Sequence, residues 1–497
     1  MLAGTVRIEK SMAANVQAIT RRLDALPTIG CLNISPYYWG MLFKTGFGWA
    51  MDSMDTFIFI YLGLVKDGWA SDLGIPSGSH ESGLLGSAAF AGSLFGSFLF
   101  GQLADLYGRK SMFMVTLVIF MVGTLLCGTS NSFGALLIFR FLTGIGLGGE
   151  LPVASVLVQE MAPTPVRGRI IVVLESFWAI GCMLAVILCN ELIKYVSWRV
   201  IFYISAIPAL YAIVIRLCLP ESPKWLASVG RMAEAEAIVQ SIELAHGVAS
   251  HPIEGEKDTT PLASMWTNLS QCERVALLFQ GESLSRTVVL WTVWTGISFT
   301  YFSIFTWLPI LRASDYDING STWQMLLIVF WQLPGYLSAA FAVEIFGRKM
   351  TLFVYLMGSF GAAMAFGYVE GTEANLLITG SLMSWFMLGA WGSLYAYTPE
   401  NYPTNIRAMG CAYPGGVSRV GAIAGSYIVP IMLGAGWGIK TIMWVAGGGP
   451  LIFIAIVLLV FGYETRGKDL EACPRVEAIV KQKAGLDEIV VETPGFD

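Results

Sequence analysis

Asp105-Leu-Tyr-Gly-Arg-Lys110 recurs as Glu344-Ile-Phe-Gly-Arg-Lys349, about 240 residues further along the chain. A second charged stretch repeats at nearly the same spacing, since Glu160-Met-Ala-Pro-Thr-Pro-Val-Arg167 returns as Glu400-Asn-Tyr-Pro-Thr-Asn-Ile-Arg407. Each copy lies between long apolar runs. Self-similarity at one fixed spacing indicates an internal duplication, so the sequence predicts two related halves.

The composition predicts that both halves lie in a membrane. Hydrophobic residues make up 55% of the 497 residues and charged residues only 13%, about half the charged share of ordinary soluble proteins. Runs of 18 or more mostly apolar residues predict spanning helices, and about twelve are present. They cover roughly 43–65, 83–104, 112–130, 133–158, 168–193, 198–219, 286–310, 322–344, 350–369, 374–398, 406–434 and 438–462.

The expected fold is therefore an all-α polytopic membrane protein, with twelve transmembrane helices in two six-helix, pseudo-symmetric bundles. A duplicated membrane module is typical of secondary transporters, whose substrate site lies where the halves meet. The expected organisation is an N-terminal tail (1–42), a six-helix bundle (43–219), a central loop with short amphipathic helices (220–285), a second six-helix bundle (286–462) and a C-terminal tail (463–497).

The basic residues predict the topology. Arg109 and Lys110 follow the second span and Arg348 and Lys349 follow the eighth, whereas connections on the other side carry mostly acidic residues. By the positive-inside rule, both tails and the central loop lie in the cytoplasm. We expect an integral protein of the cell membrane, plasma or inner.

Enzymatic and metal-dependent functions are not expected. The three histidines fall in predicted loops and the eight cysteines show no paired spacing, so we predict neither a metal site nor a cofactor. No nucleophile–base set and no basic nucleic-acid footprint is present. The expected partners are a small-molecule substrate, protons and the lipid bilayer, and we expect a monomer. A non-transporting membrane sensor is the alternative from another class.

Charged residues inside the apolar runs are candidate functional residues, because each is costly in a membrane. Asp52 and Asp55 are three residues apart and share a helix face. Asp55 lies about 18 Å from one membrane boundary and Arg140 about 10 Å from the other. In a core about 30 Å thick, the two lie at nearly the same depth and can pair. A purely structural ion pair stays an open alternative.

Three further charged residues, Glu150, Glu175 and Arg419, lie within predicted spans. Arg419 is suited to hold an anionic substrate through two parallel hydrogen bonds, whereas the two glutamates suit a cation. An ion pair that merely holds the eleventh span against its neighbours is an equally open interpretation of Arg419.

The signatures resemble those of the major facilitator superfamily over nearly the whole chain. Gly101-Gln-Leu-Ala-Asp-Leu-Tyr-Gly-Arg-Lys110 is similar to its loop 2–3 signature, and Arg140-Phe-Leu-Thr-Gly-Ile-Gly-Leu-Gly-Gly149 to its fourth-span pattern. The resemblance implies alternating access, closed on the cytoplasmic side by a latch between the halves. The gate residues it implies are Asp105, Arg109, Glu160, Arg167, Glu221, Glu344, Arg348, Glu400 and Arg407. The alternative is that these charges only enforce topology and solvate loops.

Proton coupling is a further implication of the resemblance. In proton-coupled sugar porters, an aspartate of the first span and the arginine that opens the fourth-span motif form the coupling pair. Asp55 and Arg140 occupy those positions, and Asp52, one turn away, is the substitute candidate.

Gly48-Trp-Ala-Met-Asp-Ser-Met-Asp55 and Leu174-Glu-Ser-Phe-Trp-Ala179 look closest to the niacin-transporter-like branch. That resemblance implies symport of a small aromatic or carboxylic acid such as nicotinate, with aromatic side chains stacking on its ring. The seventh span lacks the paired glutamines of sugar porters, which argues against a hexose. A sugar or organic-cation transporter remains the alternative. The candidate substrate-binding residues are Glu150, Glu175, Trp178, Tyr301, Phe305, Tyr395 and Arg419.

Overall fold

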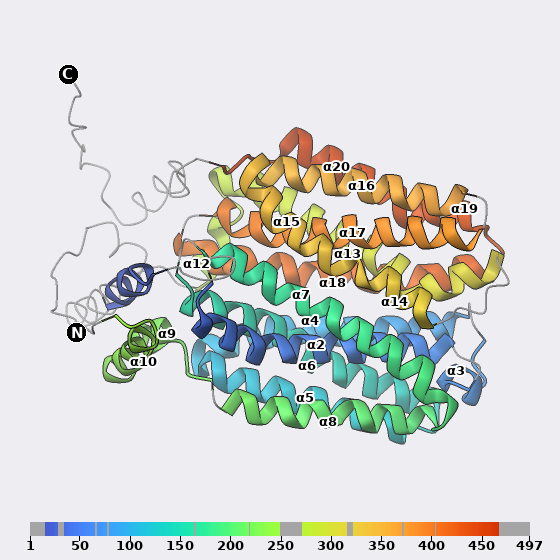
Figure 1. Ribbon diagram of the computed structural model, residues 1–497, viewed down its shortest axis with the longest axis horizontal. Helices are drawn as coiled ribbons and strands as arrows, with labels where there is room; N and C mark the ends of the chain where they lie inside the picture. The colour runs from blue at the N-terminus through green and yellow to red at the C-terminus, as the bar shows by residue number, and fades with distance from the viewer. Residues whose placement is uncertain are drawn as a thin grey trace.

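The computed structural model describes residues 15–27, 34–64, 67–76, 79–163, 166–217, 219–248, 271–315, 322–369, 372–402 and 404–466. Within these ranges the chain contains helices and no strands. The long helices run side by side along the longest axis of the molecule (Figure 1). Helices pair most of their backbone polar groups within the segment itself, which suits a lipid environment.

The first half contains six long helices. They are α2 (Pro36–Leu64), α4 (His80–Tyr107), α5 (Arg109–Thr129), α6 (Phe133–Met161), α7 (Arg167–Glu191) and α8 (Trp198–Leu217), with the short α3 (Trp69–Asp72) and η3 (Leu192–Lys194) in connections.

The second half repeats the pattern with more interruptions. Its helices are α13 (Gly281–Asp315), α14 (Thr322–Phe330), α15 (Gln332–Phe346), α16 (Arg348–Tyr368), α17 (Glu373–Tyr397), η4 (Thr398–Asn401), α18 (Thr404–Gly434), α19 (Ile439–Ile442), the π-helical turn η5 (Met443–Gly448) and α20 (Gly449–Phe461). Here α14 continues into α15, and α19 continues through η5 into α20. By length and composition, ten helical segments of the described chain can cross a membrane. With α2 and α8 they make the twelve expected spans, so the fold prediction is confirmed.

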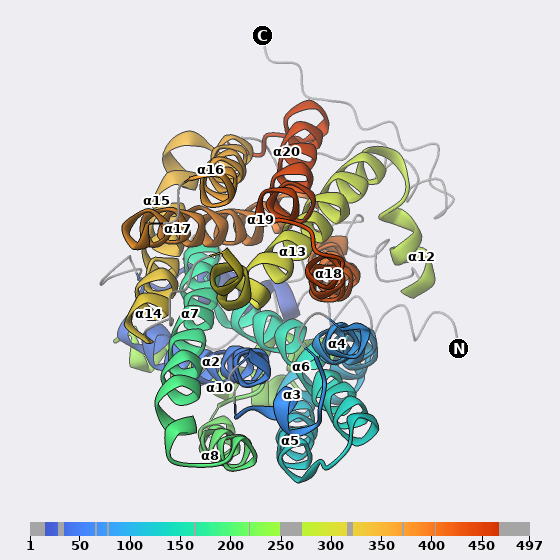
Figure 2. The same ribbon diagram turned by 90° about the vertical axis from the view of Figure 1, so that its right-hand side faces the viewer.

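Viewed along the helices, the two halves form separate groups of helices that meet along one interface (Figure 2). Across it, α4 packs against α18, and α7 packs against α14, α15 and α17. These contacts place the middles of α2, α7, α13, α17 and α18 around the centre of the molecule.

Glycine lets helices approach closely within the first half. A Cβ atom on Gly144 would lie 2.0 Å from the carbonyl oxygen of Ala89, and one on Gly148 would lie 2.0 Å from that of Ser93. The backbones of α6 and α4 are therefore in direct contact. Close backbone packing of this kind holds membrane helices together where no hydrophobic drive between them exists.

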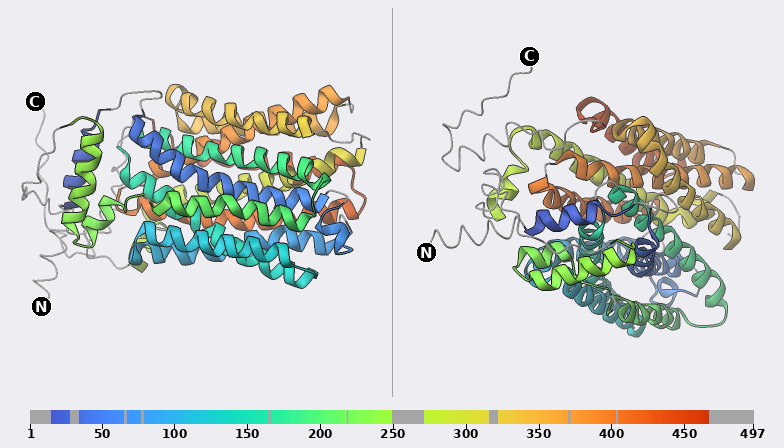
Figure 3. Two further views of the ribbon diagram at one scale, coloured as in Figure 1. Left: turned by 60° about the horizontal axis from the view of Figure 1, so that its bottom comes forward. Right: turned by 60° about the vertical axis from the view of Figure 1, so that its left-hand side comes forward.

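Short helices lie beyond one end of the bundle (Figure 3). They are α9 (Pro223–Ser228), α10 (Met232–Ala245) and α12 (Gln271–Leu277), together with a helical stretch at residues 15–24. Arg22 donates two hydrogen bonds, of 2.7 and 2.5 Å, to the carboxylate of Glu243 on α10. Because the loops that carry the repeated signatures lie at this end, we name it the signature-loop end.

Candidate functional site

A cavity lies between the halves, with an empty volume of about 460 Å³ that includes space open to solvent. Helices of both halves contribute to it. Its lining residues are Trp49 of α2; Glu175 and Trp178 of α7; Trp294, Ser298, Tyr301 and Phe302 of α13; Tyr336 of α15; Leu388, Trp391 and Tyr395 of α17; and Gly415, Ser418 and Arg419 of α18.

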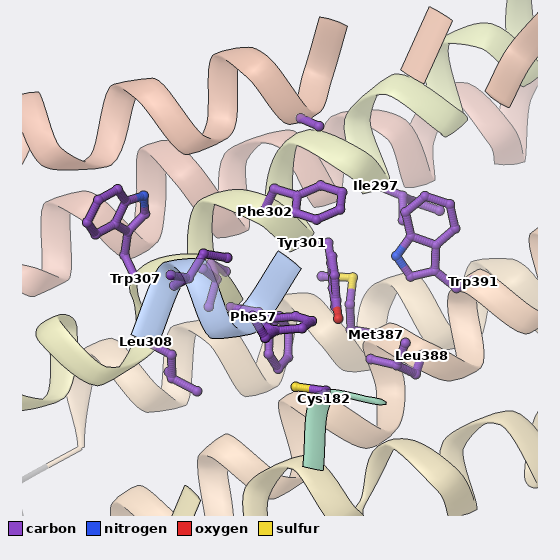
Figure 4. Packing of buried hydrophobic residues seen from close by; sticks show 14 of the residues in the cluster. Phe57, Cys182, Ile297, Tyr301, Phe302, Trp307, Leu308, Met387, Leu388 and Trp391 are labelled. Atoms are coloured by element: carbon purple, nitrogen blue, oxygen red, sulfur yellow. The ribbon is translucent and has the colours of Figure 1, made fainter. Parts of the chain in front are cut away.

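Aromatic rings form most of the cavity wall. The indole Nε1 of Trp178 donates a 2.8 Å hydrogen bond to the hydroxyl of Tyr301, which links the two halves at the cavity. The ring of Trp391 meets that of Tyr301 edge-on, with centroids 6.3 Å apart, and both labelled rings lie near Leu388 in Figure 4. Such surfaces stack well on a flat ring and offer few hydrogen bonds to a sugar.

One acidic and one basic side chain line the same cavity from opposite halves. Glu175 is 1% exposed, and its Oε1 atom has no hydrogen-bond partner among the described residues. Its polar neighbours are Trp49, Tyr395 and Arg419. The neighbours of Arg419 are Tyr395, Glu175 and Asp52. Arg419 therefore has two acidic residues in its surroundings.

Asp52 and Arg419 both line a second cavity, which adjoins the first. This cavity has an empty volume of about 330 Å³ and shares Trp49, Trp178 and Arg419 with the first. Asp52 lines only this second cavity.

Five of the seven predicted substrate-binding residues line the main cavity: Glu175, Trp178, Tyr301, Tyr395 and Arg419. The other two do not line this cavity. Phe305 stacks on Tyr301, with ring centroids 4.9 Å apart. Glu150 is buried on α6, which packs mainly against α4 and α5.

Sequence reasoning missed several lining residues that a helical spacing rule could have found. Ser298 lies three residues before Tyr301, and Gly415 lies four residues before Arg419, so each pair shares a helix face. Trp49 lies three residues before Asp52, a predicted site residue, so the same rule could have found it. Tyr336 carried no such signal.

Asp55 and Arg140 form a buried ion pair in the first half. Arg140 Nη1 lies 2.8 Å from Asp55 Oδ2, and the two residues are 2% and 1% exposed. The hydroxyl of Thr124 donates a 2.9 Å hydrogen bond to Asp55 Oδ1. The guanidinium also lies over the ring of Phe59, 4.1 Å from its centroid. The structure thus pairs two residues that the sequence predicts at nearly the same depth in the membrane.

The repeated signatures form ion pairs within their own halves. Arg109 Nη2 lies 3.1 Å from Glu160 Oε1 in the first half, and Arg348 Nη2 lies 2.8 Å from Glu400 Oε1 in the second. Glu160 lies at the end of α6 and Glu400 in η4, so each of these two pairs joins elements of one half. Pairing of these signatures across the interface stays a prediction for the gate.

A glutamate caps each of these helices. Glu221 Oε1 accepts 3.1 Å hydrogen bonds from the backbone amides of Arg109 and Lys110, and Glu464 Oε1 accepts a 3.2 Å bond from that of Arg348. Carboxylates are favoured at helix N-termini, where free amides and the helix dipole meet them. The preceding residues, Gly108 and Gly347, have φ angles of 98° and 86°, a conformation that glycine adopts without strain.

The link between the halves at this end comes from a different arginine. Arg169 Nε and Nη2 donate hydrogen bonds of 2.6 and 2.9 Å to the two carboxylate oxygens of Glu344. Glu344 was a predicted gate residue and Arg169 was not. Arg167 instead donates to the carbonyl of Ala162, 3.5 Å away. The side chains of Asp105 and Arg407 lie outside the described residues.

The halves also touch at the opposite end of the bundle. The hydroxyl of Tyr427 on α18 is hydrogen-bonded to Nδ1 of His80 on α4, and their rings meet edge-on with centroids 5.4 Å apart. In the part of the chain that the structure describes, the halves are therefore in contact at both ends of the bundle, with the main cavity between them.

Comparison with known proteins agrees with this architecture. The model of the family described as "Sugar (and other) transporter" matches residues 39–476. The niacin transporter NiaP of Acinetobacter baylyi is 40% identical over 455 residues, which cover 90% of this chain and 99% of that protein. A putative niacin/nicotinamide transporter of Bacillus subtilis is 36% identical over 434 residues, which cover 87% and 97%. Among solved structures, the proton:xylose symporter XylE of the major facilitator superfamily superposes with a TM-score of 0.68 at 20% identity, over 89% of this chain and 99% of that one.

Proposed function

Because the chain belongs to the sugar (and other) transporter family of the major facilitator superfamily, we propose that this transporter carries a small aromatic carboxylic acid, such as nicotinate, together with protons. The observation that carries the proposal is an aromatic-walled cavity between the halves that Arg419 also lines. Arginine binds a carboxylate through two parallel hydrogen bonds, while the rings stack on the substrate. The relatives named as niacin transporters, whose whole length aligns, support the same cargo.

Transport proceeds by alternating access in this proposal. The bundles at 43–219 and 286–462 rock about the cavity, and the interhalf contacts open in turn. Arg169–Glu344 closes the signature-loop end, and Tyr427–His80 closes the opposite end. We place the signature-loop end in the cytoplasm, with both tails and the connecting segment at 220–285, because its loops carry most of the basic residues.

Proton coupling is assigned to Asp55 and Arg140. While Asp55 is ionised it pairs with Arg140, and protonation removes the charge that holds the guanidinium. An uncompensated buried charge favours a rearrangement that hydrates it or gives it a new partner. Protonation therefore biases the equilibrium between the two access states.

An organic cation is the second candidate cargo, because the acidic residues Glu175 and Asp52 both lie near the cavity that Arg419 lines. A hexose is disfavoured, since the only hydroxyl-bearing aliphatic side chains in the described cavity wall are Ser298 and Ser418.

Uptake by reconstituted vesicles tests the proposal. Labelled nicotinate should accumulate when the outside is acidified, and excess unlabelled nicotinate should compete, whereas choline and glucose should not. Stimulation by acid together with competition by choline would favour the cation instead. No accumulation of any aromatic acid, with or without the gradient, would refute the proposal.

A further inference from the structure

An aromatic carboxylate requires a cation and ring faces, yet the cavity also contains a buried carboxyl group. Glu175 lines the cavity from α7, is 1% exposed and has an Oε1 atom without a hydrogen-bond partner among the described residues. A buried polar atom left without a partner is costly. A substrate that supplies a partner for this oxygen would therefore recover that cost on binding.

The charges around Arg419 indicate what kind of partner is needed. Asp52 and Glu175 both lie near enough to Arg419 to interact with its charge. A substrate that brings only a carboxylate adds another acidic group beside one guanidinium that already has two acidic neighbours. A substrate that also carries a basic or hydrogen-bonding nitrogen relieves this crowding.

We infer that Glu175 recognises a ring nitrogen of the substrate, so that the cavity selects nitrogen-heteroaromatic carboxylates over carbocyclic ones. The inference rests on the proposed function. It holds in either protonation state of the glutamate, because a carboxylate accepts a hydrogen bond from a protonated ring nitrogen and a carboxylic acid donates one to an unprotonated nitrogen.

The position of the two groups connects recognition to the transport cycle. Glu175 belongs to the first half and Arg419 to the second, and Trp178 and Tyr395 line the wall beside them. A flat substrate with a carboxylate at one edge and a nitrogen at another bridges the halves across the cavity. A ligand shifts a conformational equilibrium only through its different affinity for the two states, and a bridge of this kind exists only while the halves are closed on it.

Calorimetric binding to the full-length, detergent-solubilised protein tests the inference, with nicotinate and benzoate as the probes. Benzoate has the same carboxylate on a ring without nitrogen. We expect benzoate to bind the wild-type protein about 10- to 100-fold more weakly, the value of a lost hydrogen bond to a buried charged group. In Glu175→Met, the two affinities should converge, through weaker nicotinate binding and, because one acidic neighbour of Arg419 is gone, tighter benzoate binding.

Two further variants make the result specific. Glu175→Gln keeps the shape of the side chain and can still donate a hydrogen bond to an unprotonated nitrogen, so it should lose only part of the preference for nicotinate. It takes the place of Glu175→Met in the test if the methionine variant does not fold. Glu150→Gln changes another buried glutamate that does not line the cavity and should leave the preference unchanged.

The outcomes separate the inference from the proposed function. Equal affinities of wild-type protein for the two acids, or a preference that survives Glu175→Met, would overturn the inference and leave the proposed function standing. Binding of neither acid would overturn both.

Discussion

Asp55→Asn is the substitution that most directly tests the assigned proton coupling. Asparagine keeps the shape of the side chain and can still accept the hydrogen bond from Thr124, but it resembles a carboxyl group that is permanently protonated. Arg140 then keeps its place over the ring of Phe59 without the carboxylate that lies 2.8 Å away in the native protein.

The size of the effect on stability follows from burial. Both partners are at most 2% exposed, so water does not compensate the guanidinium when the carboxylate is removed. Removal of one partner from a buried ion pair costs about 3–5 kcal/mol, which should appear as a clear drop in melting temperature. The double variant Asp55→Asn/Arg140→Gln removes both charges and should recover much of that loss, because the uncompensated charge is gone.

Transport assays separate a coupling role from a structural one. In vesicles, Asp55→Asn should abolish accumulation driven by a pH gradient while it preserves exchange of labelled for unlabelled substrate, which needs no net proton movement. The double variant should regain stability without regaining accumulation. Proton-driven accumulation at the wild-type level in Asp55→Asn would refute the assignment. If Asp52→Asn abolishes accumulation instead, the coupling role belongs to that residue.

Three further predictions concern the gate, the packing and the short helices at the signature-loop end. Glu344→Arg should increase alkylation of cysteines introduced at the signature-loop end, because it replaces the 2.6 Å contact with Arg169 by repulsion. A compensating Arg169→Glu should reverse the increase. No change in labelling would contradict the gate role. Gly144→Val should prevent folding, since even a Cβ atom would lie 2.0 Å from a carbonyl oxygen of α4, whereas Gly134→Val, with nothing within 4 Å of its Cβ position, should express normally; equal yields would contradict the packing argument. Burial, and after it the nearby charge of Arg167, lowers the pKa of Lys224 to about 8, below its unfolded value of about 10.4. Between these two values the unfolded chain binds more protons than the folded one, so the melting temperature should rise with pH across that window. Lys224→Met should flatten this rise, and an unaltered pH profile would exclude Lys224 as its source.

Much of the fold follows from properties that are local in the chain. Apolar runs of membrane length predicted the spans, and the repeated signatures predicted the two halves. Gly108 and Gly347 predicted tight turns, because only glycine takes a positive φ without strain. The Asp55–Arg140 pair was also predictable, since depth in a membrane depends only on how many residues separate a side chain from the end of its helix.

The tertiary structure decided which residues face the cavity and which pairs join the halves. In a membrane, surfaces that face lipid and surfaces that pack against other helices are both apolar, so hydrophobic periodicity does not reveal the rotation of a helix about its axis. Phe305 and Tyr301 were therefore indistinguishable in sequence, although one supports the wall and the other forms it. For the same reason, the charged loops predicted a gate, but only the packing of α7 against α15 selected Arg169 and Glu344 as the residues that link the halves.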